Sequence, residues 1–338
     1  MTAEDAFRLT RQLIDIESIT GNETAVGEFL LAELLQMGFA AQKMPVAEKR
    51  FNIYAQVPDT KPHVVFSTHI DTVPPFIPSS EDAEKIYGRG ACDTKGITGA
   101  MLHAATRLLA EKAPIGLLFV VDEERDSIGA RAANVSPMNP KAKFLINGEP
   151  TENKVAIASK GSLKVIVTAR GRMAHSAYPE LGDSAIEKLL AALNKIRAVP
   201  LPNNPEIGPT TMNIGIIEGG RAPNVIPDFA RAQILYRLVG PAQELKRNIE
   251  ESVRGIVGVQ VDAEVNNEFI KLRTFESLPT FVAAYTTDIP ALSNWGEPIL
   301  FGPGSIHVAH TTGEYMEKKQ MMEAAEIYYS MAKQLLTQ

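Results

Sequence analysis

Five short polar segments of this 338-residue chain place histidine or carboxylate side chains at the ends of apolar runs. These side chains are ligands that Zn²⁺, Co²⁺ and Mn²⁺ accept in hydrolytic sites. Four segments lie in the first half of the chain and the fifth lies near its C-terminus. If one fold brings them together, they form a two-metal hydrolytic site. The segments are Thr68-His69-Ile70-Asp71, Cys92-Asp93-Thr94-Lys95-Gly96, Asp122-Glu123-Glu124, Gly148-Glu149-Pro150 and His307-Val308-Ala309-His310.

The first two segments each have a plain and a functional interpretation. His69 and Asp71 are two residues apart, so in an extended segment Asp71 can orient an imidazole that binds a metal. Most such pairs are only solvated or structural. Asp93 lies in a glycine-rich loop before a predicted helix, where it could cap the helix or bridge two metals. The glycines of this loop are too widely spaced for a phosphate-binding loop.

The other three segments leave similar choices open. Glu123 and Glu124 are adjacent carboxylates that repel each other, so they need either solvent, as in an exposed turn, or a cation. In the functional interpretation Glu124 binds a metal and Glu123 is the general base for the attacking water. Glu149 could be an ordinary loop residue. His310 could be a buried structural histidine, or His307 could be the ligand in its place.

Alternating strands and helices must position these residues. Three of the segments directly follow predicted strands, and in a parallel sheet the carboxyl ends of the strands are where ligands gather. We therefore expect the three to emerge at one edge of a mainly parallel sheet. Asn22 is expected to cap the second helix and Gly38 to end it. The predicted elements are helices at 3–16, 23–37 and 97–111 and strands at 52–57, 63–67, 116–121 and 144–147.

The pattern changes at about residue 160. Residues 160–268 predict a compact α+β unit of ordinary domain size. A helix at 275–285, a strand at 298–301 and a helix at 316–336 then resume the earlier style. The predicted fold class is therefore α/β, with a mainly parallel-sheet catalytic domain made from residues 1–159 and 269–338. The α+β domain is inserted into it.

Composition narrows the class of protein. The chain is 45% hydrophobic and 22% charged, as expected of a soluble globular protein. A net charge of -6 argues against a nucleic-acid partner, and no apolar run is long enough to span a membrane. The acidic N-terminus lacks the features of a signal peptide, and a single cysteine fits a reducing compartment. These features predict a cytoplasmic protein.

Taken in order, the five segments resemble those of the co-catalytic metallohydrolase family of aminoacylase, acetylornithine deacetylase, succinyl-diaminopimelate desuccinylase and glutamate carboxypeptidase. Order, spacing and flanking residues agree over nearly the whole chain. The segment His310-Thr311-Thr312-Gly313-Glu314-Tyr315 matches the family's histidine-to-glutamate spacing, which favours His310 over His307. The resemblance implies His69, Asp93 and Glu149 around one metal, Asp93, Glu124 and His310 around the other, Glu123 as general base and Asp71 orienting His69.

The resemblance also assigns the inserted domain as a lid and dimerisation domain. His175, in Ala174-His175-Ser176, matches a lid histidine that reaches the partner subunit's active site in dimeric members. Asn224 and Arg237 match lid positions that hold the substrate carboxylate, although Tyr236 stands where an acidic or aliphatic residue is common. Gly304 matches a substrate-facing loop.

The implied activity is hydrolysis of an amide bond next to a free carboxylate, with two divalent metal ions, zinc first and cobalt or manganese as alternatives. Members of the family with glutamate at the position of Glu149 resemble aminoacylases and carboxypeptidases, whereas those with aspartate there resemble aminodipeptidases and tripeptidases. We therefore expect a homodimeric N-acyl-amino-acid deacylase, with a zinc carboxypeptidase or dipeptidase as the alternative. A phosphoesterase lacks a supporting phosphate-binding motif. A non-catalytic relative that binds amino acids or peptides is disfavoured, because every ligand position and the base are present.

Overall fold

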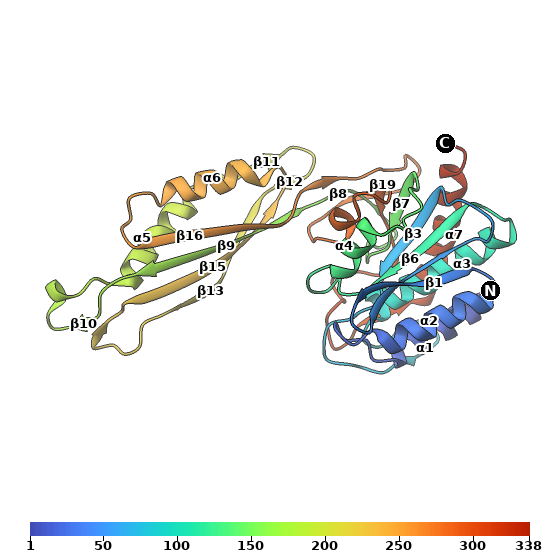
Figure 1. Cartoon of the computed structure of the whole chain (residues 1–338), viewed down its shortest axis with the longest axis horizontal. Helices are drawn as coiled ribbons and strands as arrows, with labels where there is room; N and C mark the ends of the chain where they lie inside the picture. The colour runs from blue at the N-terminus through green and yellow to red at the C-terminus, as the bar shows by residue number, and fades with distance from the viewer. The chain divides into compact units, whose positions relative to one another are not determined.

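The computed structural model describes residues 1–265 and 267–338, and the chain folds into two compact units (Figure 1). The first unit comprises Met1–Ile157, Leu272–Phe281 and Thr287–Gln338, and the second comprises Ala158–Lys271 and Val282–Thr286. Every helix in the described residues is too short or too polar to cross a lipid bilayer.

A six-stranded sheet forms the centre of the first unit, in the order β1-β2-β6-β3-β7-β19. Strands β6, β3, β7 and β19 run parallel, and β1 and β2 add an antiparallel edge. The mainly parallel α/β fold predicted from the sequence is therefore confirmed. The strands are β1 Ala40–Ala47, β2 Arg50–Gln56, β3 Val64–His69, β6 Ile115–Val120, β7 Phe144–Asn147 and β19 Glu297–Leu300.

Both faces of the central strands β3, β6 and β7 are buried, which explains the long apolar runs in these strands. Along β3, Phe66 packs into the core formed with α1, α2, α3 and α7, whereas Val65 packs into a second core with α4. In that second core Tyr54 meets Trp295 edge-on, with ring centroids 5.8 Å apart. The helices are α1 Ala3–Asp15, α2 Thr24–Met37, α3 Gly96–Ala110, α4 Ile128–Val135 and α7 Lys318–Leu335.

Helix α2 ends as predicted but does not begin as predicted. Gly38 adopts φ +98°, and its N–H donates to the carbonyl oxygens of the last turn. The cap predicted at Asn22 is wrong, because the N-cap residue is Glu23, which makes no side-chain capping bond. Asn22 instead donates to Glu17, and the Glu23 carboxylate accepts the N–H of Gly21 and the guanidinium of Arg50.

The structure differs from the prediction at two other elements, the helices expected at 275–285 and 316–336. The helix predicted at 275–285 is wrong: this region contains strand β18 Thr280–Ala283, in a small sheet of order β17-β8-β18 with β8 Val155–Ser159 and β17 Ile270–Lys271. Short apolar runs do not distinguish helix from strand, and the Thr-Phe-Val sequence favours strand once a partner is available. The C-terminal helix begins at Lys318 because Tyr315–Glu317 pairs as β20 with β5 Lys85–Tyr87.

The second unit contains a four-stranded antiparallel sheet of order β13-β15-β9-β16, covered on one face by α5 and α6. Along β9, Val165 and Val167 are buried in the core with these helices, whereas Lys164 and Ile166 are partly exposed. This alternation is typical of a sheet with one covered face. The elements are β9 Gly161–Arg170, β13 Thr211–Gly219, β15 Phe229–Leu238, β16 Val259–Asn267, α5 Ala185–Arg197 and α6 Ala242–Ser252.

Candidate metal centre

Three adjacent parallel strands deliver most of the candidate ligands to one edge of the sheet. His69 is the last residue of β3, which pairs with both β6 and β7. Glu123 and Glu124 follow the end of β6, and Glu149 follows the end of β7. Asp93 comes from the short helical segment Ala91–Lys95 that leads into α3, and His310 comes from the loop between β19 and β20.

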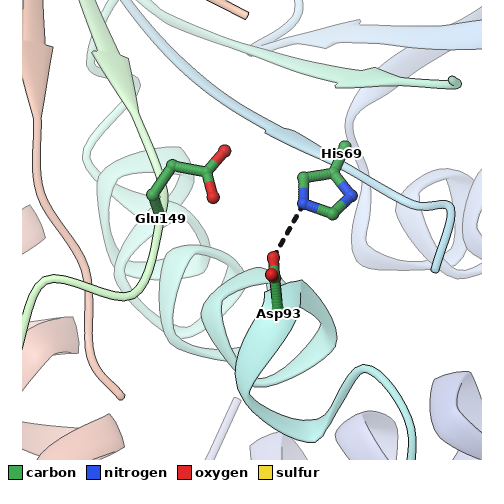
Figure 2. A group of neighbouring side chains, drawn as sticks. All are labelled: His69, Asp93 and Glu149. Carbon is green, nitrogen blue, oxygen red and sulfur yellow. Dashed lines mark hydrogen bonds and ion pairs between the residues drawn. The ribbon is translucent and has the colours of Figure 1, made fainter. Parts of the chain in front are cut away.

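These residues form two donor groups that share Asp93. The donor atoms of His69, Asp93 and Glu149 all lie within 4.8 Å of one another, as do those of Asp93, Glu124 and His310. Asp93 Oδ1 lies 2.9 Å from His69 Nε2, and Asp93 Oδ2 lies 3.2 Å from His310 Nε2. Figure 2 shows the side chains of the first group turned toward a common point. The two oxygens of Asp93 thus face different donor groups, as a bridging carboxylate requires.

The charge and burial of the first group fit a cation. Glu149 is 4% exposed, and its Oε1 has no hydrogen-bond partner among the described residues. A buried carboxylate without a partner is costly unless it takes up a proton or faces a cation. Accordingly, burial raises the pKa of Glu149 well above its usual value. Burial and the charge of Glu149 do the same to the pKa of Glu123. Divalent cations would compensate this buried negative charge.

Without a cation, the pKa values of both histidines are raised, which favours their protonated forms. Burial alone would lower the pKa of His69, but Asp71 and Asp93 raise it well above its usual value. Hydrogen bonds to Asp93 and Glu124 raise the pKa of His310 to about 10. Burial opposes ionisation of Asp93, but its hydrogen bonds with the two histidines lower its pKa. Metal binding would therefore have to displace protons from both imidazoles.

Asp71 connects the first ligand to the loop that carries Glu123. His69 Nδ1 lies 3.0 Å from the backbone oxygen of Asp71 and 3.5 Å from its carboxylate. Both groups therefore face the imidazole, whereas the sequence suggested the carboxylate alone. The same carboxylate accepts the backbone N–H groups of Glu123 (3.1 Å) and Glu124 (3.3 Å) and the hydroxyl of Thr20 (2.9 Å). The sequence did not predict that Asp71 also holds the backbone of Glu123 and Glu124.

Sequence reasoning missed the partner of Asp122 and a further buried acid beside the site. Asp122 adopts φ +72° and accepts a 2.7 Å hydrogen bond from Arg50, which also binds Glu23. Arg50 opens a strand and has no local feature that distinguishes it from a solvated arginine. Asp288 is buried, and burial raises its pKa to about 7, while its Oδ1 has no partner among the described residues. No pattern around Asp288 predicts a buried acid.

The second unit holds the three predicted lid residues, at opposite ends of its sheet. His175, in β10 Ala174–His175, is exposed and pairs with Val225, and the carbonyl of Asn224 accepts the N–H of the next residue, Ser176. Arg237 pairs with Thr211 at the far end of β15. Phe229, at the end of β15 near His175, is eight positions from Arg237, roughly 26 Å at about 3.3 Å per residue. Figure 1 shows β10 at one end of this unit's sheet and, at the other, β11 Asn203–Asn204 and β12 Gly208–Pro209, which come shortly before Thr211.

Gly304 and His307 lie outside both donor groups. Gly304 adopts φ +83°, and a Cβ there would lie 2.4 Å from Cys92 Sγ, so only glycine fits. It lines a cavity of about 330 Å³ together with Ser305 and Tyr315. His307 is exposed and contributes no donor atom to either group, whereas His310 does.

A parallel sheet with histidine and carboxylate donors at its carboxyl edge defines a metallohydrolase class, and sequence comparison identifies the family. The model of Peptidase family M20/M25/M40 matches residues 65–334. A peptidase M20 domain-containing protein of Schizosaccharomyces pombe is 37% identical over 347 residues, covering 97% of this chain and 84% of the relative. A probable carboxypeptidase of Emericella nidulans is 38% identical over 374 residues, covering 96% and 88%. The chain belongs to Peptidase family M20/M25/M40.

Solved structures show the same fold. A tripeptidase from Staphylococcus aureus has a TM-score of 0.84 at 21% identity, covering 100% of both chains. An M20 family metallo-carboxypeptidase from Sulfolobus solfataricus has a TM-score of 0.79 at 16% identity, covering 99% of this chain and 100% of the other. The family predicted from the sequence is confirmed, and the protein is a metal-dependent peptidase or amidohydrolase. The names of the relatives favour the carboxypeptidase alternative over the N-acyl-amino-acid deacylase expected first.

Proposed function

We propose that this protein is a zinc-dependent carboxypeptidase that hydrolyses the amide bond next to the free carboxylate of a peptide. The observation that carries the proposal is the pair of donor groups sharing Asp93, each with one histidine and one further carboxylate. Relatives called probable carboxypeptidases support this substrate class over an N-acyl amino acid. The donor set accepts Zn²⁺, with Co²⁺ or Mn²⁺ as substitutes.

Two divalent cations, when bound, would polarise the scissile carbonyl and make water a better nucleophile. Glu123 accepts the proton of the attacking water and passes it to the leaving amine. Burial and the charge of Glu149 raise its pKa, which favours uptake of a proton by this carboxylate. Asp71 holds the Glu123 backbone by a 3.1 Å hydrogen bond, so the base keeps a defined position.

The proposal extends to the substrate carboxylate and to a homodimer. Arg237 can bind both oxygens of a carboxylate, His175 can donate to the developing oxyanion, and Asn224 lies beside His175. Because Arg237 and His175 lie at opposite ends of one sheet, a substrate that touches both would draw them from two subunits. Strand β13, at the edge of this sheet, exposes Ile216 (48%) and Ile217 (59%) and offers a surface for a second copy.

Matched substrates test the proposed activity. The metal-loaded protein should release the last residue of an N-blocked peptide with a free C-terminus and leave the C-amidated form of the same peptide intact. Activity should vanish with a chelator and return with Zn²⁺ or Co²⁺. Faster cleavage of N-acetyl amino acids than of the peptide would instead favour a deacylase. Release of only the N-terminal residue from an unblocked peptide would indicate an aminopeptidase.

Mixed subunits test the dimer. Glu123→Ala and His175→Ala should each be nearly inactive alone, and a mixture should recover activity if His175 acts across the dimer. Ile216→Lys should shift the protein toward monomer in size-exclusion chromatography with light scattering. Val257→Lys is the matched control, because Val257 is an 82% exposed apolar residue outside the strands. Mixtures without recovered activity, or an Ile216→Lys variant that stays dimeric, would contradict this arrangement.

A further inference from the structure

A buried ion pair joins the loop that carries Asp93 to the segment that carries His310. The side chains of Arg89 and Glu314 are 2% and 0% exposed, and Arg89 Nη1 donates to Glu314 Oε2. The other carboxylate oxygen, Oε1, accepts the backbone N–H groups of Cys92 and Asp93, each at 3.0 Å. Glu314 therefore holds the backbone of the residue that the two donor groups share.

The same pair also anchors the segment directly after His310. Arg89 Nη1 donates to the carbonyl of Thr311 at 3.1 Å, and the N–H of Gly88 donates to the carbonyl of Glu314 at 3.2 Å. The His310 side chain is 48% exposed, so core packing alone does not hold it. Besides its own contacts with Asp93 and Glu124, its position depends on the hydrogen bonds between residues 88–93 and 311–314.

Glu314 is not arranged as a metal ligand. Both of its carboxylate oxygens accept hydrogen bonds, from two backbone N–H groups and from the guanidinium. It also lies outside both donor groups. Its contribution to the site is therefore made through the positions of Asp93 and His310.

We propose that Glu314, paired with Arg89, is a positioning residue that sets the spacing between Asp93 and His310 and so the affinity of the second metal site. This inference rests on the proposed two-metal function. The first site should depend less on the pair, because His69 and Glu149 are held by the ends of β3 and β7. The second site takes two of its three ligands, Asp93 and His310, from the segments that the pair joins.

Calorimetric titration of the chelator-treated full-length protein with Zn²⁺ tests the inference, and the absorption spectrum of bound Co²⁺ reports ligand geometry. Wild type should bind two equivalents. Glu314→Gln should bind the first with little change and the second at least tenfold more weakly, with an altered Co²⁺ spectrum. Glu314→Asp should also bind the second Zn²⁺ more weakly, because the shorter side chain cannot reach both the Arg89 guanidinium and the backbone N–H groups of Cys92 and Asp93. Glu326→Gln is the control, because it removes the partner of Arg107 from an exposed pair and should leave both affinities unchanged.

A double variant separates positioning from general destabilisation. Glu314→Gln with Arg89→Met leaves no buried unpaired charge and should recover thermal stability, yet the second site should stay weak because the tie to Thr311 is lost. Wild-type affinity at both sites in Glu314→Gln, or full recovery of the second site in the double variant, would overturn the inference. If Glu314→Gln does not fold, Arg89→Lys decides by the same measure, since lysine keeps the charge but is one bond too short to take the place of Nη1, which binds Glu314 Oε2 and the Thr311 carbonyl. Fewer than two equivalents bound by wild type would instead count against the proposed function.

Discussion

Replacing Glu123 by glutamine tests the role of general base with little change in shape. In the described part of the chain, the hydrogen bond of Glu123 is made by its backbone N–H to Asp71, and its carboxylate makes none. Glutamine keeps this backbone bond and the side-chain volume but cannot accept a proton from water. The variant therefore removes the proposed chemistry and leaves the position of the loop unchanged.

The expected loss can be stated in free energy. Removing a general base lowers the rate by roughly 10²–10⁴-fold, which at about 1.36 kcal/mol per tenfold raises the barrier by about 3–5 kcal/mol. The free energy of unfolding should rise rather than fall in this variant. Burial and Glu149 raise the pKa of Glu123, so ionisation of this carboxylate opposes folding, and a neutral amide removes that cost. The metal-free variant should be at least as stable as wild type.

Peptide hydrolysis rates, metal content and urea unfolding of the same preparations provide the measurements. Glu124→Gln is the matched comparison, because Glu124 Oε1 lies 2.9 Å from His310 Nε2 and belongs to the second donor group. That variant should lose one metal equivalent, whereas Glu123→Gln should keep two. More than a tenth of wild-type turnover in fully loaded Glu123→Gln, or loss of a metal from it, would refute the division of roles between these neighbours.

Three further predictions concern ionisable side chains in or beside the site. Because the pKa of His310 is about 10 without metal, metal binding should release protons and the apparent affinity should rise with pH, which titration between pH 6 and 8 checks; a flat profile would contradict it. The pKa of Asp288 is raised from 3.8 to about 7, so its stabilising contribution is present below pH 3.8 and is lost as pH rises through 7. Asp288→Asn should therefore gain stability over wild type across that window, up to about 4 kcal/mol in the metal-free protein, and a difference independent of pH would oppose this. Arg50→Met leaves Glu23 and Asp122 without their cation and should cost about 3 kcal/mol in urea unfolding, with a loss under about 1 kcal/mol counting against a structural role for this pair.

Local sequence determined most of the elements and nominated the candidate ligands of this protein. The apolar run Val64-Val65-Phe66 predicts a strand buried on both faces, and Gly38 ends its helix because glycine adopts a positive φ at little cost. Both features depend on residues close in the chain. His69, Asp93, Glu149 and His310 were nominated by residue type and by their position next to such elements. The family followed from the order of the five segments.

Tertiary structure decided which of these residues meet and what holds them. Asn22 does not cap α2 because the N-cap position falls on Glu23 and the Asn22 side chain donates to Glu17 instead, and residues 280–283 become a strand because β8 offers a partner. Arg89 and Glu314 are 225 positions apart, so no local pattern relates them. Hydrogen bonds and ion pairs of this kind depend on the path of the whole chain, whereas propensity depends on neighbours. The sequence thus determined the chemistry available to the site, and only the folded chain decided how Asp71, Glu314 and Arg50 support it.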